Sequence, residues 1–324
     1  MNFQAARKSS WPAQGSIVLT RATNLHMLIR ELVRSLGWTV TEATDSIQSA
    51  LHSVRKGATT LLIVDDTPDF PAIETMRHLM RDPVGAITPT LVFAQDQTKA
   101  ETPALQRLGR PSVVEKPLTP SKFQPAFQSL VRRWDEGPWL SLRQAKYEII
   151  NGNLNTGLKQ IARLSEQEAV HTLCATTLSI QLRTMGKIKE AETLLLNCLK
   201  RSPRDLGALM ALGDLYIHTA MPKLAHRVFA GARNAYPGSM IPVADLMQAA
   251  LMMGQIQDAI GYLYTMFKAA HQMDKVPQYL ARLLYSEGRE GEAEKVVNHN
   301  RAAFSRIQAA WNSAESANNL AAAG

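Results

Sequence analysis

Apolar positions in the first 137 residues form short runs that alternate with stretches of helical spacing. The runs have the length of strands, and they cover 16–20, 59–64, 89–94 and 112–115. Residues 38–42 alternate between apolar and polar positions, which predicts a further strand. Between the predicted strands apolar residues recur every three or four positions, which predicts helices at 25–36, 47–55, 74–81, 105–108 and 123–134. Strands that alternate with helices predict an α/β domain over 16–137, with a five-stranded, doubly wound parallel sheet.

From residue 138 onward the pattern is helical and repeats every 34 residues. Small residues carry this period in two registers, at Gly152, Gly186, Ala220, Gly254 and Gly288 and again at Gly157, Ala191, Ala225, Ala259 and Ala293. Such a period is typical of stacked helix–turn–helix units, because each unit buries its apolar face only against its neighbours. We therefore predict an α-solenoid of five units over 138–307. An alanine-rich helical bundle with accidental spacing is the alternative.

The unit at 206–239 shows the pattern most clearly. Its small residues would let two helices approach closely, its large residues would fill the grooves between them, and a proline would end the second helix. The residues concerned are Leu212, Gly213, Tyr216, Ala225, Phe229, Ala232 and Pro237. In these positions the unit resembles a tetratricopeptide repeat. The resemblance implies that the first helix of each unit lines a concave, partner-binding face.

The chain ends and the junction between the two halves are polar. We expect a flexible leader at 1–15, and a capping helix with a frayed tail at 308–324. The junction at 135–138 is short, which favours fixed docking of the two parts over a flexible tether.

Composition narrows the function classes. The net charge is +8, but the basic residues are spread, so a solvated surface is favoured over a nucleic-acid stripe. The two cysteines, Cys174 and Cys198, build no disulfide framework, and no zinc spacing occurs. Neither a signal-peptide pattern nor a membrane-spanning run is present, so we expect a cytoplasmic protein without membrane contact.

Ligands in such sheets bind at the carboxyl ends of the strands. The residues predicted to lie there are Thr20–Arg21, Asp65–Asp66, Ala94–Gln95 and Lys116–Pro117. The sequence LLIVDD and the Glu-Lys-Pro after the fifth strand resemble a response-regulator receiver domain over about 16–134. The resemblance implies that Asp65 holds the phosphoacceptor position, with Asp66 as the alternative, and that Lys116 would contact a phosphoryl group.

Several receiver positions depart from the family pattern. Thr20 and Arg21 stand where an acidic pair would help to hold Mg²⁺, Ala94 replaces a hydroxyl residue, and Ser112 replaces an aromatic one. An arginine beside Asp65 would hold it ionised without metal. We therefore expect a degenerate receiver without cofactor; Mg²⁺ would bind only if the domain were a working phosphoreceiver. Asp65–Asp66 as a loop cap in another α/β fold is a further alternative.

The resemblance to tetratricopeptide repeats also implies which residues face a partner. These inward positions are Thr176, Ile180, Arg183, Met210, Asp214, Ile217, Ala244, Gln248, Leu251, Gln278, Arg282 and Tyr285. An apolar floor that carries Arg183 and Arg282 would suit a peptide with a carboxylate. The alternative is that both arginines are solvated surface residues.

The sequence contains no nucleophile–base–orienter set and no glycine-rich phosphate loop, so we do not expect an enzyme. The favoured function is a bacterial signalling adaptor whose repeats bind a protein partner. A phosphorylation-switched response regulator with the repeats as its output is one alternative. A regulator that binds nucleic acid is another. The sequence does not indicate an oligomeric state.

Overall fold

The structure is a computed structural model that describes residues 15–20, 22–57, 60–67, 71–95, 102–269 and 275–299. The contacts group the chain into two compact units, 1–242 and 243–324, each considered by itself below. The predicted leader and tail lie outside the described residues, apart from Gly15. The predicted domain boundary at 137/138 falls inside the first unit, because the first three repeats pack against the α/β domain.

A five-stranded parallel sheet forms the centre of the first unit. Its strands are β1 (Gly15–Leu19), β2 (Thr39–Thr44), β3 (Leu61–Asp65), β4 (Thr90–Ala94) and β5 (Ser112–Glu115), in the order β2-β1-β3-β4-β5. Strands β1, β3 and β4 are buried throughout, as expected for a sheet covered on both faces. Exposure alternates along β2, the edge strand, as its sequence pattern predicts. The predicted parallel sheet is confirmed.

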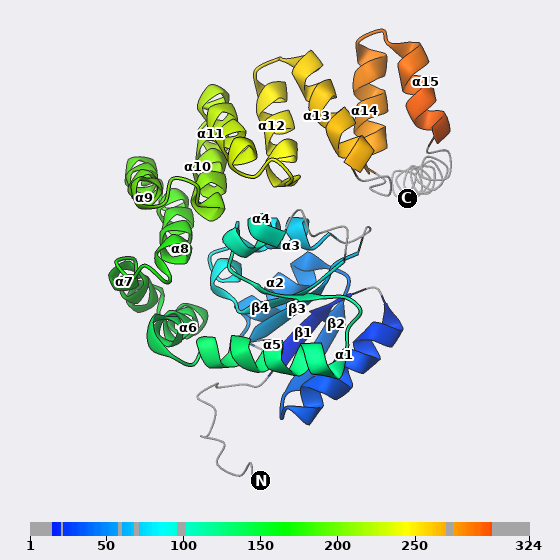
Figure 1. Ribbon diagram of the computed structural model, residues 1–324. Helices are drawn as coiled ribbons and strands as arrows, with labels where there is room; N and C mark the ends of the chain where they lie inside the picture. The colour runs from blue at the N-terminus through cyan, green and yellow to red at the C-terminus, as the bar shows by residue number, and fades with distance from the viewer. Residues whose placement is uncertain are drawn as a thin grey trace, which may run out of the picture. The chain divides into compact units, whose positions relative to one another are not determined.

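Helices cover both faces of this sheet (Figure 1). Helices α1 (Thr23–Ser35) and α5 (Pro120–Arg133) lie on one face, and α2 (Ile47–Arg55) and α3 (Ala72–Leu79) lie on the other. A short 3₁₀ helix, η1 (Gly85–Ile87), precedes β4, and α4 (Thr102–Arg107) precedes β5. Aromatic rings fill the core between α5 and the sheet, where the Phe123 and Phe127 centroids are 5.4 Å apart.

Three helix pairs of the repeat region complete the first unit. They are α6 (Gly137–Ile150) with α7 (Leu154–Leu164), α8 (His171–Thr184) with α9 (Ile188–Arg201), and α10 (Leu206–His218) with α11 (Pro222–Ala235). Figure 1 shows the first helix of each pair on the side of the sheet domain and the second helix outside. The junction is rigidly packed, since Trp134 after α5 and Trp139 in α6 have ring centroids 5.0 Å apart.

The two small-residue registers have different structural reasons. The first register has positive φ in each turn between paired helices, at Gly152, Gly186, Ala220, Gly254 and Gly288. Glycine adopts this left-handed conformation readily, whereas Ala220, with φ of 54°, adopts it against its preference. The second register is buried between helices, and Ala191, Ala225, Ala259 and Ala293 are fully inaccessible. The paired helices that the 34-residue period predicts are present over the described residues.

Neighbouring repeats pack through small side chains as well. Ala175, Cys198 and Ala208 form one cluster that joins α8, α9 and α10, with Leu194 and Leu199 against it. Cys198 thus occupies a buried position between helices that needs a small apolar residue.

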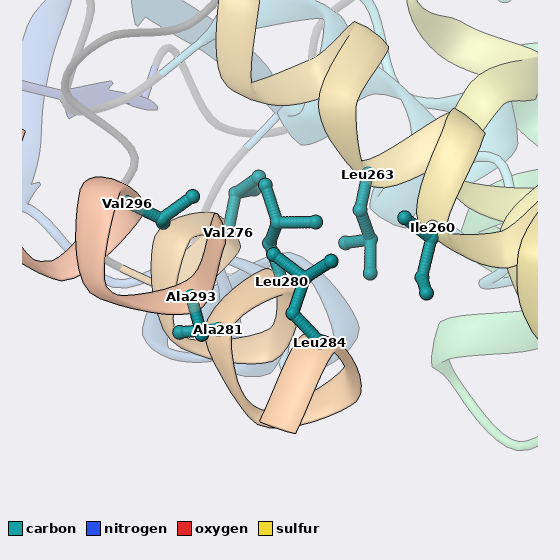
Figure 2. Close-up of a cluster of buried hydrophobic side chains, with 8 residues drawn as sticks. All are labelled: Ile260, Leu263, Val276, Leu280, Ala281, Leu284, Ala293 and Val296. Carbon is teal, nitrogen blue, oxygen red and sulfur yellow. The ribbon is translucent and has the colours of Figure 1, made fainter. Parts of the chain in front are cut away.

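The second unit contains the remaining helix pairs of the described chain. They are α12 (Ile241–Met252) with α13 (Ile256–Ala269), and α14 (Lys275–Ser286) with α15 (Glu290–His299). A buried apolar cluster holds α13, α14 and α15 together (Figure 2). Its residues are Ile260, Leu263, Val276, Leu280, Ala281, Leu284, Ala293 and Val296, and Met247 of α12 packs against them. The helix pairs continue the period predicted from the sequence.

Candidate functional site: a strand-end pocket and the inner face of the repeats

The first candidate site is the group of polar side chains at the carboxyl end of β3, called the Asp65 pocket below. Asp65 is 1% exposed there, and its carboxylate is held from two sides. The Thr20 hydroxyl donates a hydrogen bond of 2.7 Å to Oδ2, and Lys116 Nζ lies 2.6 Å from Oδ1. The structure thus brings together three residues that the sequence placed at strand ends. Arg21 lies outside the described residues.

Asp66 has a different role from its neighbour. Its Oδ1 accepts a 2.8 Å hydrogen bond from the amide of Ala72, the first residue of α3, and its Oδ2 accepts one from the Gln95 amide. A carboxylate at a helix start satisfies amides that have no partner within the helix. Asp66 therefore fixes α3 to the sheet, and Asp65 is the residue that faces Lys116.

The described residues of this pocket do not fit a divalent cation. Both oxygens of Asp65 are engaged by Thr20 and Lys116, and those of Asp66 face backbone amides. Mg²⁺ is bound in proteins through carboxylates and water in octahedral geometry, and the Lys116 ammonium group lies against the Asp65 carboxylate where a cation would have to approach. Over the described ranges, no group of three His, Cys, Asp or Glu side chains has a metal-binding arrangement. Ala94, 2% exposed at the end of β4, offers only a methyl group, which is no metal ligand.

The second candidate site is the inner face of the repeats, and in the first unit this face is covered. Thr176, Ile180 and Met210 are buried, at 1%, 7% and 0% exposure. Helix α8 contacts η1, and α10 contacts α4, so the α/β domain supplies the cover. These positions were predicted to face a partner. A partner does not reach them in this arrangement, because another part of the same chain lies there.

Asp214 of α10 is the main charged contact of this covered face. Arg77 Nη1 and Nη2 donate to its two oxygens at 2.7 and 2.5 Å, and Arg81 Nε and Nη2 donate at 3.2 and 2.9 Å. Burial would raise the pKa of the Asp214 carboxyl, but the two guanidinium groups outweigh it and hold that pKa below its usual range. Arg183 and Ile217, also predicted inward, are half-buried nearby on the same helices, and Arg183 lines a small pocket beside Asp214 and Arg81.

Sequence reasoning missed Arg77 and Arg81. Arg77 lies in the last turn of α3 and Arg81 in the turn that follows it, and more than 130 residues separate both from Asp214. The available signal was two arginines four residues apart, which alone is typical of an ordinary solvated surface.

The same inward positions in the second unit are more open. Gln248 and Arg282 are exposed, Leu251 and Tyr285 are 36% and 48% exposed, and Ala244 and Gln278 are half-buried. Repeat positions of one type are therefore covered in the first unit and accessible in the second. The predicted role of these residues in binding a partner stays a prediction.

A buried lysine lies where the first repeat meets the α/β domain. Lys146 of α6 is 1% exposed, and no described residue accepts a hydrogen bond from its Nζ. Burial lowers the pKa of Lys146 to about 7, and repulsion from Arg143 acts in the same direction. Attraction to Asp82 offsets part of this shift. The Asp82 carboxylate accepts hydrogen bonds from the Arg55 side chain and from the backbone amides of Val84 and Gly85.

Comparisons with known proteins give no family for this chain. No protein-family model matches it, and no curated protein does. Among solved structures, the chain is similar to MamA 41-end from Desulfovibrio magneticus RS-1, with 18% identity, a TM-score of 0.42, and coverage of 51% of this chain and 96% of that one. It is also similar to a protein described as a thermophilic TPR protein in Thermus thermophilus, with 18% identity, a TM-score of 0.38, and coverage of 54% and 99%. Similarity at this level carries no argument about partners or activity.

In the part of the chain that the structure describes, every helix is too short or too polar to span a bilayer.

Proposed function

We propose that this chain is a protein-interaction scaffold of bacterial signalling, in which a degenerate receiver-like domain is joined to tetratricopeptide-type repeats. The observation that carries the proposal is the open inner face of the second unit. Leu251 and Tyr285 present exposed apolar side chains there, and Arg282 adds a charged group. Inner faces of stacked repeats are extended binding surfaces, and apolar anchors beside a cation suit a peptide with an acidic group.

The receiver-like part of the proposal draws support from the strand order and from the Asp65 pocket. The order β2-β1-β3-β4-β5 is that of flavodoxin-like doubly wound folds, in which ligands bind at the carboxyl ends of strands. Thr20 and Lys116 already satisfy the Asp65 carboxylate, and Ala94 cannot donate a hydrogen bond to an arriving phosphoryl group. Both features favour a domain that is held in one state and acts through its surface, without catalysis.

A photo-crosslinking experiment tests the scaffold. The full chain carries a photoreactive phenylalanine in place of Tyr285, or in place of Leu196 on the outer helix α9, where exposure is similar at 41%. In extract from the native cell, we expect a discrete crosslinked protein from position 285 and none from 196. Equal labelling from both positions, or none from 285, would contradict the proposal.

A phosphorylation-switched regulator remains the second candidate, because Lys116 lies 2.6 Å from Asp65 as a phosphoryl-binding lysine would require. Intact-mass measurement after incubation with acetyl phosphate and Mg²⁺ distinguishes the scaffold from the phosphorylation-switched regulator. We expect no added phosphoryl group. A stoichiometric addition that is lost in Asp65→Asn would favour the switched regulator instead.

A further inference from the structure

Helix α6 packs against the α/β domain through contacts on either side of a buried lysine. Arg143 Nη2 donates a hydrogen bond of 2.7 Å to Asp135, which follows α5. Ile150 ends α6 close to Gly57, where an added Cβ atom would lie 3.0 Å from Ile150 Cγ2. Lys146 lies between these contacts in the sequence of α6 and is 1% exposed. Its amino group is therefore enclosed where the first repeat meets the α/β domain.

The nearby carboxylates are already engaged by other groups. Asp82, in the turn before η1, attracts Lys146, but it accepts hydrogen bonds from Arg55 and from backbone amides. Asp135 is paired with Arg143, which repels Lys146. Over the described residues, no atom accepts a hydrogen bond from Lys146 Nζ.

The elements that contact α6 supply no further carboxylate for the lysine. Helix α6 contacts α5, α7 and η1, and η1 has no titratable side chain. Glu148 of α6 accepts a hydrogen bond from Asn153. The remaining charged or titratable side chains on α5, α6 and α7 are Lys122, Arg132, Arg133, Tyr147, Lys159 and Arg163. None of these is an anion at neutral pH, so a charge on Lys146 stays uncompensated.

Proton uptake therefore opposes this packing. Burial lowers the pKa of Lys146 to about 7 in the folded chain, against ~10.4 for a lysine in water. At pH 8 the enclosed lysine is mainly neutral, and at pH 6 it must carry a charge without an acceptor. Separation of α6 from the α/β domain would hydrate that charge. The open state thus binds the proton more tightly than the closed state, so acid favours opening.

We infer that the contact between α6 and the α/β domain is a pH-sensitive switch, which is closed while Lys146 is neutral and loosens when Lys146 takes up a proton. The 3₁₀ helix η1 contacts both α6 and α8. Loosening of this segment should therefore uncover part of the inner face on α8, where Thr176 and Ile180 are buried. The inference concerns regulation of the covered face and does not depend on the open face of the second unit.

Hydrogen exchange of the full chain at pH 8 and pH 6 tests this switch. Division by the intrinsic exchange rate at each pH gives the opening constants of amides in α6, η1 and α8. With a pKa of about 7 in the closed state and ~10.4 in the open state, we expect opening constants about tenfold larger at pH 6 than at pH 8. Below about pH 6 they should level off, because Lys146 is then protonated in both states.

Lys146→Met replaces the charged group by an apolar chain of similar length. It should remove the tenfold change and keep the protection that the wild type shows at pH 8. Lys159→Met, at an exposed position of α7, is the matched control and should keep the wild-type pH dependence. Equal opening constants of the wild type at both pH values would overturn the inference. So would a pH dependence in Lys146→Met that equals that of the wild type.

A titration of the wild-type chain keeps the inference testable if Lys146→Met does not fold. Lysine labelled with ¹³C at Cε reports the protonation of each amino group by NMR. A lysine resonance should titrate with a midpoint near pH 7, whereas those of exposed lysines titrate near pH ~10.4. Titration of every lysine resonance above about pH 9 would show that Lys146 stays charged in the closed state, which would overturn the inference.

Discussion

The close approach of α10 and α11 makes a sharp prediction at Gly213. A Cβ atom added there would lie 2.7 Å from Phe229 Cδ1 and closer still to Cε1 and Cζ. Phe229 is fully buried, so its ring has no open space to turn into. Gly213→Ala must therefore separate the two helices or strain the Phe229 ring. Such overpacking costs about 1–3 kcal/mol of folding free energy, and a contact this close lies at the upper end of that range. This cost outweighs the ~1 kcal/mol that alanine gains over glycine in a helix. We expect a net destabilisation of the folded chain.

Gly231 supplies the matched control, since it lies in α11 with no heavy atom within 4 Å of an added Cβ. Gly231→Ala should leave stability unchanged or raise it by up to about 1 kcal/mol. Hydrogen exchange of the α10 and α11 amides, together with urea unfolding followed by circular dichroism, measures both variants. Shifts of the same sign and size would refute the account of this helix contact.

Three further predictions follow from single residues. Ala220→Gly should stabilise the chain by about 1 kcal/mol in urea unfolding, because it relieves the positive φ. Lys146→Met should stabilise the chain more at pH 6 than at pH 10, as measured by urea unfolding at both pH values. The pKa of Lys146 is about 7 in the folded chain and ~10.4 in the unfolded chain, so the wild type becomes more stable as the pH rises from 7 to 10. Burial raises the thiol pKa values of Cys174 and Cys198 to about 12 and about 11, so neither should react with iodoacetamide at pH 8 until urea unfolds the chain.

The repeat region was largely predictable because its constraints leave a chemical trace at fixed spacing. A left-handed turn favours glycine, and a close helix contact needs glycine or alanine, so both constraints contribute to the 34-residue period from which the solenoid was predicted. The sheet was predictable for a similar reason, since fully buried strands appear as short apolar runs. In each case the residues that reveal an element belong to that element.

The covered face was not predictable, because the contact between Asp214 and the two arginines joins segments distant in sequence. Thr176, Ile180 and Met210 fit a binding face by their repeat position, but position does not say what covers them. Lys146 likewise has the sequence context of a solvated lysine. Which of Asp65 and Asp66 faces Lys116, and which accepts a hydrogen bond from the start of α3, also needed coordinates.

The account's central claim is that the α/β domain docks on the inner face of the repeats through Asp214. A double-mutant cycle of Arg77→Met and Asp214→Leu, measured by urea unfolding of the full chain, tests it most directly. We predict a coupling energy of about 1–3 kcal/mol, because each single variant leaves a charge without this partner at a largely buried contact. Additive effects, with a coupling energy of zero, would contradict the docking.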